Sequence, residues 1–178
     1  MQVYDWQAIV NEQGPLVWQT AYRLLGNDAD AADCFQETFL AAFEIAHAQR
    51  VRNLCGLLVR LATTRAIDRL RQRSRQVQHN GAALTGADAN NACVGDPCAV
   101  AQQRELAAQL RQAIARLPPP ESKAFCLRYV SGLSYRQIAR ELDISTNATG
   151  VLLHRVKRKL RKALQVAQVP TGGVFYER

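Results

Sequence analysis

The 178-residue sequence contains no apolar run that approaches the roughly 18 to 20 residues needed to span a membrane. Its N-terminal stretch, MQVYDWQAIVNEQG, carries acids but no Lys or Arg, so a signal peptide is not expected. Strand patterns are nearly absent, whereas Ala, Leu, Gln and Arg are abundant and apolar residues recur at helical spacing. Together with a hydrophobic content of 48%, these features predict a folded all-α protein without membrane insertion.

Cysteines are few and odd in number, at five, so a disulfide framework is not expected and a reducing cytoplasm fits better. Cys34, Cys55 and Cys126 lie in apolar helical patterns and are predicted to be buried as small hydrophobic side chains. Cys93 and Cys98 have no further Cys or His pair nearby, so we expect no metal site there, and a redox role for them is the alternative.

The sequence also lacks a nucleophile–base pair, a phosphate-binding loop and a cluster of metal ligands, and its three His residues are scattered. We therefore predict no catalytic residues, no metal and no cofactor. An enzyme is the least favoured class of function.

Acids are concentrated early in the chain, so the net charge of +8 is unevenly distributed. Residues 1–49 carry seven acids and one base, whereas residues 50–76 carry eight Arg and one acid. Residues 77–101 contain no Lys or Arg, and residues 102–178 carry fourteen bases and five acids. Two basic blocks predict two surfaces for a polyanion, which is either nucleic acid or an anionic membrane surface.

The spacing of apolar residues predicts two small helical domains, 1–76 and 101–169, joined by a flexible linker over 77–100 and followed by a short tail, 170–178. The linker is rich in Ala, Gly, Asn and Asp and lacks periodicity. In the first domain we expect helices over 4–12, 15–25, 30–46 and 54–75, with a break at Gly14 and a loop over 47–53. In the second domain we expect helices over 101–117, 121–130, 134–142 and 146–168.

The segment 134–162 predicts a helix-turn-helix. Ser134 and Gln137 form a capping box, Asp143 suits a left-handed turn, and Ser145 can cap the last helix. The second helix of such a motif enters the DNA major groove. A basic helix that is only solvated on its polar face is the alternative. The DNA-binding residues predicted on this helix are Thr146, Asn147, Gly150, His154, Arg155, Lys157 and Arg158.

Every base in the block 50–76 is Arg, which favours planar, bidentate contacts with phosphates and bases. Arg65, Arg69 and Arg73 recur at i, i+4 and i+8, flanked by Arg71 and Arg75. The block is therefore predicted to bind nucleic acid, and a solvated helix end is the alternative. Asp68 is expected to pair with an Arg on a neighbouring turn.

A third candidate surface is acidic. Asp33, Gln36 and Glu37 lie at i, i+3 and i+4, so they share one exposed face of a helix. Acids repel DNA, so this face suits either a basic protein partner or water alone. The residues by themselves favour water.

Three segments, in their order along the chain, resemble the extracytoplasmic-function (ECF) sigma factors of bacteria. They are DADAADCFQETFLAAF, LLVRLATTRAIDRLRQRSR, and LPPPESKAFCLRYVSGLSYRQIARELDIS followed by LLHRVKRKLRKAL. The resemblance covers nearly the whole chain outside the linker and the tail. It implies a transcription initiation factor without catalytic activity, which binds core RNA polymerase and directs it to the −10 and −35 elements of promoter DNA.

The resemblance implies a role for each segment. Asp33, Gln36 and Glu37 match the family's D-x-x-Q-E pattern, which docks on the clamp coiled coil of the polymerase β′ subunit; the β flap is a second expected contact. The helix-turn-helix corresponds to the part that binds the −35 element. The loop 47–53 and the Arg-rich helix correspond to the part that opens the −10 element and holds a flipped base. The residues implied at the −10 element are Asn53, Thr64, Arg65, Arg69, Arg71 and Arg73. An anti-sigma factor is the regulator that the family implies.

At several positions the chain departs from the family's pattern. Leu57 replaces a common Trp, and Thr64 replaces an Asn. In the last helix, Gly150 and Leu152 stand where a Lys and an Arg are common, so fewer base contacts are expected near its start. The alternative function is a stand-alone helix-turn-helix regulator that binds DNA as a dimer and does not act through polymerase.

Overall fold

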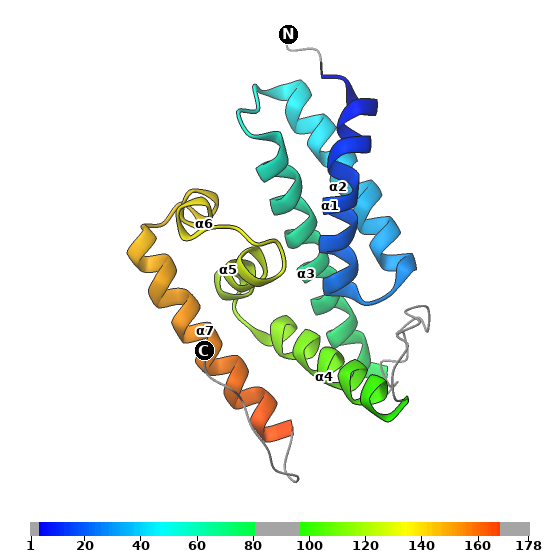
Figure 1. Ribbon diagram of the computed structural model, residues 1–178, viewed down its shortest axis with the longest axis vertical. Helices are drawn as coiled ribbons and strands as arrows, with labels where there is room; N and C mark the ends of the chain where they lie inside the picture. The colour runs from blue at the N-terminus through cyan, green and yellow to red at the C-terminus, as the bar shows by residue number, and fades with distance from the viewer. Residues whose placement is uncertain (1–3, 81–96, 168–178) are drawn as a thin grey trace.

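The computed structural model describes residues 4–80 and 97–167, and the secondary structure of these residues is entirely helical (Figure 1). The first domain consists of α1 (Trp6–Leu25), α2 (Asp28–Ala48) and α3 (Leu54–Asn80). The second consists of α4 (Pro97–Arg116), α5 (Pro119–Tyr129), α6 (Tyr135–Leu142) and α7 (Thr146–Ala167). The predicted all-α fold is confirmed. Among the described helices, none is long and apolar enough to cross a bilayer.

The helix α1 corrects the sequence-based prediction, because it runs without a break through Gly14 and Pro15. Proline removes only its own N–H from the helical hydrogen bonds and adds a local clash, a cost that tertiary packing can outweigh. Gly14 is buried, and a Cβ atom built on it would lie 3.6 Å from the ring of Phe35 on α2. Helix α1 ends at Gly26, where the backbone adopts φ 74° and the N–H donates to the carbonyl of Tyr22.

Two other boundaries differ from the prediction. Helix α3 continues to Asn80 and α4 begins at Pro97, so both ends of the predicted linker 77–100 are helical. Residues 81–96 lie outside the described part of the chain. Helix α5 begins at Pro119 rather than at residue 121, because the first helical positions need no N–H donor and therefore accept proline.

The helix-turn-helix forms as predicted. The Gln137 N–H donates to Ser134 Oγ at 3.3 Å, and the Ser134 N–H donates to Gln137 Oε1 at 2.8 Å, which completes the capping box of α6. Asp143 adopts the left-handed conformation with φ 54°, and Ser145 Oγ accepts the N–H of Ala148 at the start of α7. These contacts fix the turn that orients α7 against α6.

The cysteines agree with the prediction in two of three described cases. Cys34 and Cys126 are fully buried, but Cys55 is exposed at the start of α3, so the prediction for Cys55 is wrong. Burial raises the pKa of the Cys34 thiol to about 11 and that of Cys126 to about 12. Cys93 and the side chain of Cys98 lie outside the described residues, so their redox alternative stays open.

The two domains share a hydrophobic core. Leu24, Ile67 and Leu70 of the first domain pack in one cluster with Leu117 and Val156 of the second. In a smaller cluster, Val59 packs with side chains of α5, α6 and α7. Helix α3 is therefore the element on which the second domain rests, and Figure 1 shows α4 crossing its C-terminal end. The contacts between α3 and the second domain define what we call the domain interface.

Candidate nucleic-acid interface

The acidic face of α2 lies on the outside of the first domain. Asp33 and Gln36 are exposed, and the Glu37 side chain is 44% exposed. One turn further along, the side chain of Leu40 is 64% exposed. The predicted face is thus extended by an apolar side chain that sequence reasoning did not single out.

The arginines at i, i+4 and i+8 on α3 turn toward this acidic helix. Arg69 donates to Glu37 Oε1 at 2.6 Å and to Asp33 Oδ2 at 3.2 Å. Arg65 lies 3.7 Å from Glu37, and Arg73 forms an ion pair with Asp30. Burial by itself lowers the pKa of the Arg69 guanidinium, but its hydrogen bonds to Glu37 and Asp33 outweigh that effect and raise it. These three cations are therefore partly neutralised by α2 and do not form a free basic surface.

Arg71 points to the opposite side of α3, into the domain interface. It donates to the carbonyl of Leu117 at 3.1 Å and to Ser122 Oγ at 2.9 Å. It also lies 3.5 Å from Asp68, which confirms the local pairing expected for that acid. Because its side chain is only 16% exposed, Arg71 joins the two domains in this arrangement.

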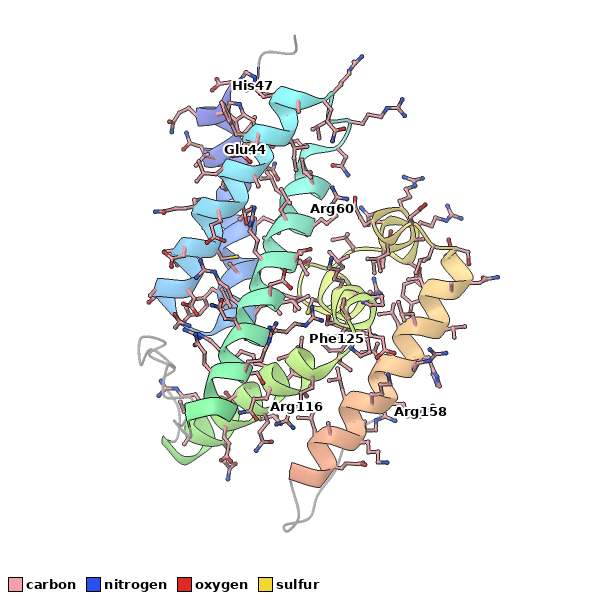
Figure 2. All side chains as sticks on the ribbon, turned by 180° about the vertical axis from the view of Figure 1, so that it is seen from behind. Glu44, His47, Arg60, Arg116, Phe125 and Arg158 are labelled. Atoms are coloured by element: carbon pink, nitrogen blue, oxygen red, sulfur yellow. The ribbon has the colours of Figure 1, made fainter. Side chains whose placement is uncertain are left out.

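Thr64 lies in the same interface. It lines a cavity of about 270 Å³ between α3, α5 and α6, together with Arg60, Lys123 and Glu141. Arg60 lies 3.4 Å from Glu141 across this cavity, and Figure 2 shows its side chain between α3 and α6. Thr63 and Ser131, also on opposite sides of the interface, have their hydroxyl oxygens 3.4 Å apart.

Asn53 is the one predicted −10 residue at the far end of α3. Its Oδ1 accepts the Gly56 N–H at 2.9 Å and so caps the helix. The preceding loop, 49–53, exposes Arg50 and Arg52, which have no ion pair among the described residues. The two loop arginines were counted in the basic block and were not distinguished from the others by the sequence.

The aromatic side chains beside this loop form a cluster. The ring of Trp6 lies 5.3 Å from that of Phe43, and Phe43 lies 4.9 Å from His47, which is exposed at the end of α2. Figure 2 shows His47 and Glu44 at this end of the molecule, far from the second domain. Exposed cations beside aromatic rings suit a single-stranded nucleic acid, whose phosphates and bases they contact respectively.

The outer face of α7 carries the second basic surface. Its buried stripe, which includes Leu153, Val156 and Leu160, docks on the domain. Arg158 lies on the outer side of the helix in Figure 2. Six of the seven residues predicted there are exposed: Thr146, Asn147, His154, Arg155, Lys157 and Arg158. Within the described chain, the only cation of α7 that forms an ion pair is Lys159, which binds the buried Glu121 at 2.8 Å.

Gly150, the seventh predicted residue, is half-buried and turns toward α6. A Cβ atom built on it would lie 3.9 Å from the ring of Tyr135. Lys157 is similarly close to an aromatic ring, with its Nζ 5.3 Å from the centre of the Tyr129 ring. The outward face of α7 is therefore basic and polar, and its cations are available to a polyanion.

The sequence matches two family descriptions, Sigma-70 region 2 over residues 9–76 and Sigma-70, region 4 over residues 107–160. It is 31% identical over 164 residues to the ECF RNA polymerase sigma factor SigE of Mycolicibacterium smegmatis, which covers 90% of this chain and 62% of SigE. It is 30% identical over 155 residues to the ECF RNA polymerase sigma factor SigW of Bacillus subtilis, which covers 84% of this chain and 83% of SigW. The chain thus spans less than two thirds of SigE and most of SigW.

Two solved structures have a similar fold. The sigma factor RpoE in complex with the anti-sigma factor NepR, from Bartonella quintana, matches with a TM-score of 0.58 and 20% identity, over 92% of this chain and 99% of RpoE. CnrH, in complex with the cytosolic domain of CnrY, matches with a TM-score of 0.56 and 18% identity, over 90% and 88% of the two chains. The positions matched by the two Sigma-70 regions lie within the two helical domains, one in each. The chain therefore belongs to the ECF sigma factors, the family that directs RNA polymerase to specific promoters.

Proposed function

We propose that this chain binds core RNA polymerase through the acidic face of α2 and binds the −35 element through the outer face of α7. The observation that carries the proposal is the outer face itself, where exposed Asn147, His154, Arg155 and Arg158 lie on the second helix of a helix-turn-helix. On α2, exposed Asp33, Gln36 and Leu40 offer a mixed acidic and apolar surface. Such a surface fits a basic protein partner and not DNA.

For the −10 element we propose the end of the first domain that is farthest from the second domain. The loop 49–53 supplies the free cations Arg50 and Arg52, and Asn53 closes the loop against α3. In this proposal the role of Arg65, Arg69 and Arg73 is indirect. They hold the acidic side chains of α2 in the positions from which α2 binds polymerase. Thr64 and Arg71 become available to DNA only when the second domain moves away from α3.

That movement follows from the size of the molecule. The two promoter elements are named for positions about 25 base pairs apart, which is about 85 Å of B-form DNA at 3.4 Å per base pair. A compact chain of this length has a radius of gyration of about 16 Å and hence a diameter of about 40 Å. We propose that the arrangement with a shared core is a closed state, and that the domains separate when the chain occupies a promoter.

One contact between the domains, at the C-terminal end of α1, lowers the cost of separation. Arg111 of α4 packs against Gly26, and its guanidinium would be 2.8 Å from a Cβ atom there. Burial, and after it repulsion from Arg73, lowers the pKa of Arg111, because the charged form of this side chain is less favourable in the closed state than in water. Opening returns this cation to water.

A protein that binds the closed state would keep the chain from promoters. The two solved relatives are complexes with NepR and with the cytosolic domain of CnrY. We propose that an anti-sigma factor regulates this chain, that the chain acts in the cytoplasm, and that it has no catalytic activity of its own.

The experiment that tests the proposed function is run-off transcription with purified core polymerase and a library of promoters. The expected result is a set of transcripts that depend on this chain and on both promoter elements. Tight binding to isolated DNA without any effect on initiation would support the stand-alone regulator instead. Arg158→Ala should weaken binding to every promoter and reduce its salt dependence, because Arg158 would contact phosphate.

A further inference from the structure

Val151 is an exposed apolar side chain at the centre of the outer face of α7. It is 61% exposed, and it lies on the side of the helix opposite to the buried Leu153 and Val156. Asn147 precedes it by four residues and Arg155 follows it by four, so these side chains lie above and below it on the same face. Val151 thus interrupts a polar and basic stripe.

The core gives no reason for a valine at this position. The side chain lies away from the packed clusters of the second domain, and valine is a weaker helix former than the straight-chain residues. The adjacent Leu152 is half-buried and Leu153 is buried, so docking of α7 does not require a third apolar neighbour. Among the described residues none buries Val151, so an apolar contact with a partner is the use that we consider.

The surroundings of Val151 indicate what it contacts. His154, Arg155 and Arg158 are exposed around it, and a surface of this charge repels basic protein partners and attracts DNA. In a helix-turn-helix, the first turns of the second helix reach the edges of the bases in the major groove. The apolar group that the major groove offers is the C5-methyl of thymine.

Asn147 supplies a polar contact beside it. Its side chain is exposed and has no hydrogen bond within the described chain. The asparagine amide matches the N6 and N7 atoms of adenine. Residues four apart lie about 6 Å apart along the helix axis and successive base pairs are about 3.4 Å apart, so Asn147 and Val151 reach base pairs that are one or two steps apart.

We infer that Val151 determines specificity at the −35 element by packing on a thymine methyl, one or two base pairs from an adenine bound by Asn147. The inference rests on the proposed function and adds to it the bases that are recognised. It assigns to Val151 a role that neither the charge of α7 nor its capping implies.

The test replaces single atoms of the DNA. Promoters are first selected with the holoenzyme, formed from core polymerase and the full chain, from a library randomised over the −35 element. Each thymine of the selected element is then replaced by uracil, which removes only the C5-methyl group. Open-complex formation is measured with the wild-type chain, with Val151→Ser, and with Arg158→Ala as the matched control.

The expected result is one thymine, on either strand, whose replacement lowers open-complex formation by the wild-type chain about threefold to fourfold, as expected for loss of one buried methyl group. Val151→Ser should be equally active on both templates, because it has no methyl to place on the base. Arg158→Ala should be weaker on both templates but keep the wild-type ratio between them. Circular dichroism melting should show that Val151→Ser is folded, since the position is exposed.

Two results would overturn the inference. One is that no uracil replacement affects the wild-type chain although transcription depends on the −35 element; the proposed function would then stand without this contact. The other is a uracil effect that persists in Val151→Ser. Transcription that does not depend on the −35 element at all would remove the proposed function and the inference together.

Discussion

Arg69 donates to Glu37 at 2.6 Å, and this contact joins a residue expected to bind DNA to one expected to bind polymerase. The same guanidinium lies 3.2 Å from Asp33. The two oppositely charged segments of the first domain therefore neutralise each other in part. The surface of α2 that remains available to a partner consists of Gln36, Leu40 and the exposed parts of Asp33 and Glu37.

Arg69→Ala should destabilise the first domain. The side chain is 22% exposed, and its removal leaves Asp30, Asp33 and Glu37 facing one another without their shared cation. We expect a loss of about 1 to 2 kcal/mol in the free energy of unfolding, measured by urea denaturation. Arg75→Ala, at an exposed position on the same helix, should have little effect. Equal stability of the two variants would show that the cluster contributes nothing.

Gln36→Ala and Leu40→Ala should weaken binding to core polymerase without loss of stability. Both side chains are exposed on the acidic face, so truncation removes a contact with a partner and leaves the core intact. We expect each to lower the affinity about tenfold, as measured by fluorescence anisotropy of a labelled chain. The matched control is Gln103→Ala, an exposed position on α4. Wild-type affinity of both α2 variants would refute the assignment of this face.

Arg71→Ala should shift the chain from the closed state toward the open state. The variant loses the hydrogen bonds to Leu117 and Ser122, and hydrogen bonds from a charged group are worth about 1.5 to 3 kcal/mol. The ratio of closed to open molecules should fall by about tenfold or more. Energy transfer between dyes on Cys55 and on Lys162→Cys, with Cys93 and Cys98 replaced by Ser, measures the separation. An unchanged transfer efficiency would mean that Arg71 does not hold the domains together.

The buried thiols predict a loss of stability in alkali. The pKa of Cys34 is raised to about 11 and that of Cys126 to about 12, from 9.0, because burial disfavours the thiolate. Above pH 9 the unfolded chain releases these protons while the folded chain keeps them, so the stability present below pH 9 declines as the pH rises toward 11 or 12. Urea denaturation at pH 8 and at pH 10.5 measures this decline.

The paired variant Cys34→Ala/Cys126→Ala should lose about 1 to 3 kcal/mol less than the wild-type chain between these two pH values. Cys55→Ala, at the exposed position, should follow the wild-type chain more closely. If the double variant declines as steeply as the wild-type chain, other groups carry the alkaline transition.

Local signals predicted much of the fold. The capping box at Ser134, the left-handed turn at Asp143 and the cap at Ser145 were all expected from sequence, because each depends on residues a few positions apart. Pro15 misled the prediction because its local cost is outweighed by packing of α1 on the rest of the bundle. The prediction that Cys55 is buried was wrong because an apolar pattern in the sequence does not define the edge of the buried face of a helix.

The candidate sites were harder to predict, because their state depends on contacts between distant residues. Arg69 meets Glu37 across 32 positions of sequence, and Arg71 meets Leu117 across 46. A helical wheel groups Arg65, Arg69 and Arg73 correctly on one face but cannot show that this face is covered by acids. On α7 the prediction depended only on positions within one helix. Six of the seven residues predicted there are exposed, as expected.

The most direct test of the account locks the domain interface. Thr63 and Ser131 face each other with hydroxyl oxygens 3.4 Å apart, so Thr63→Cys/Ser131→Cys can be oxidised to a disulfide between the domains. Cys55, Cys93 and Cys98 are replaced by Ser to prevent other pairings. Run-off transcription with core polymerase is then compared for the oxidised chain, the reduced chain and each single Cys variant. We expect promoter-specific transcript from the reduced chain and from the single variants, none from the oxidised chain, and recovery when the disulfide is reduced. Full promoter-specific transcription by the oxidised chain would contradict this expectation.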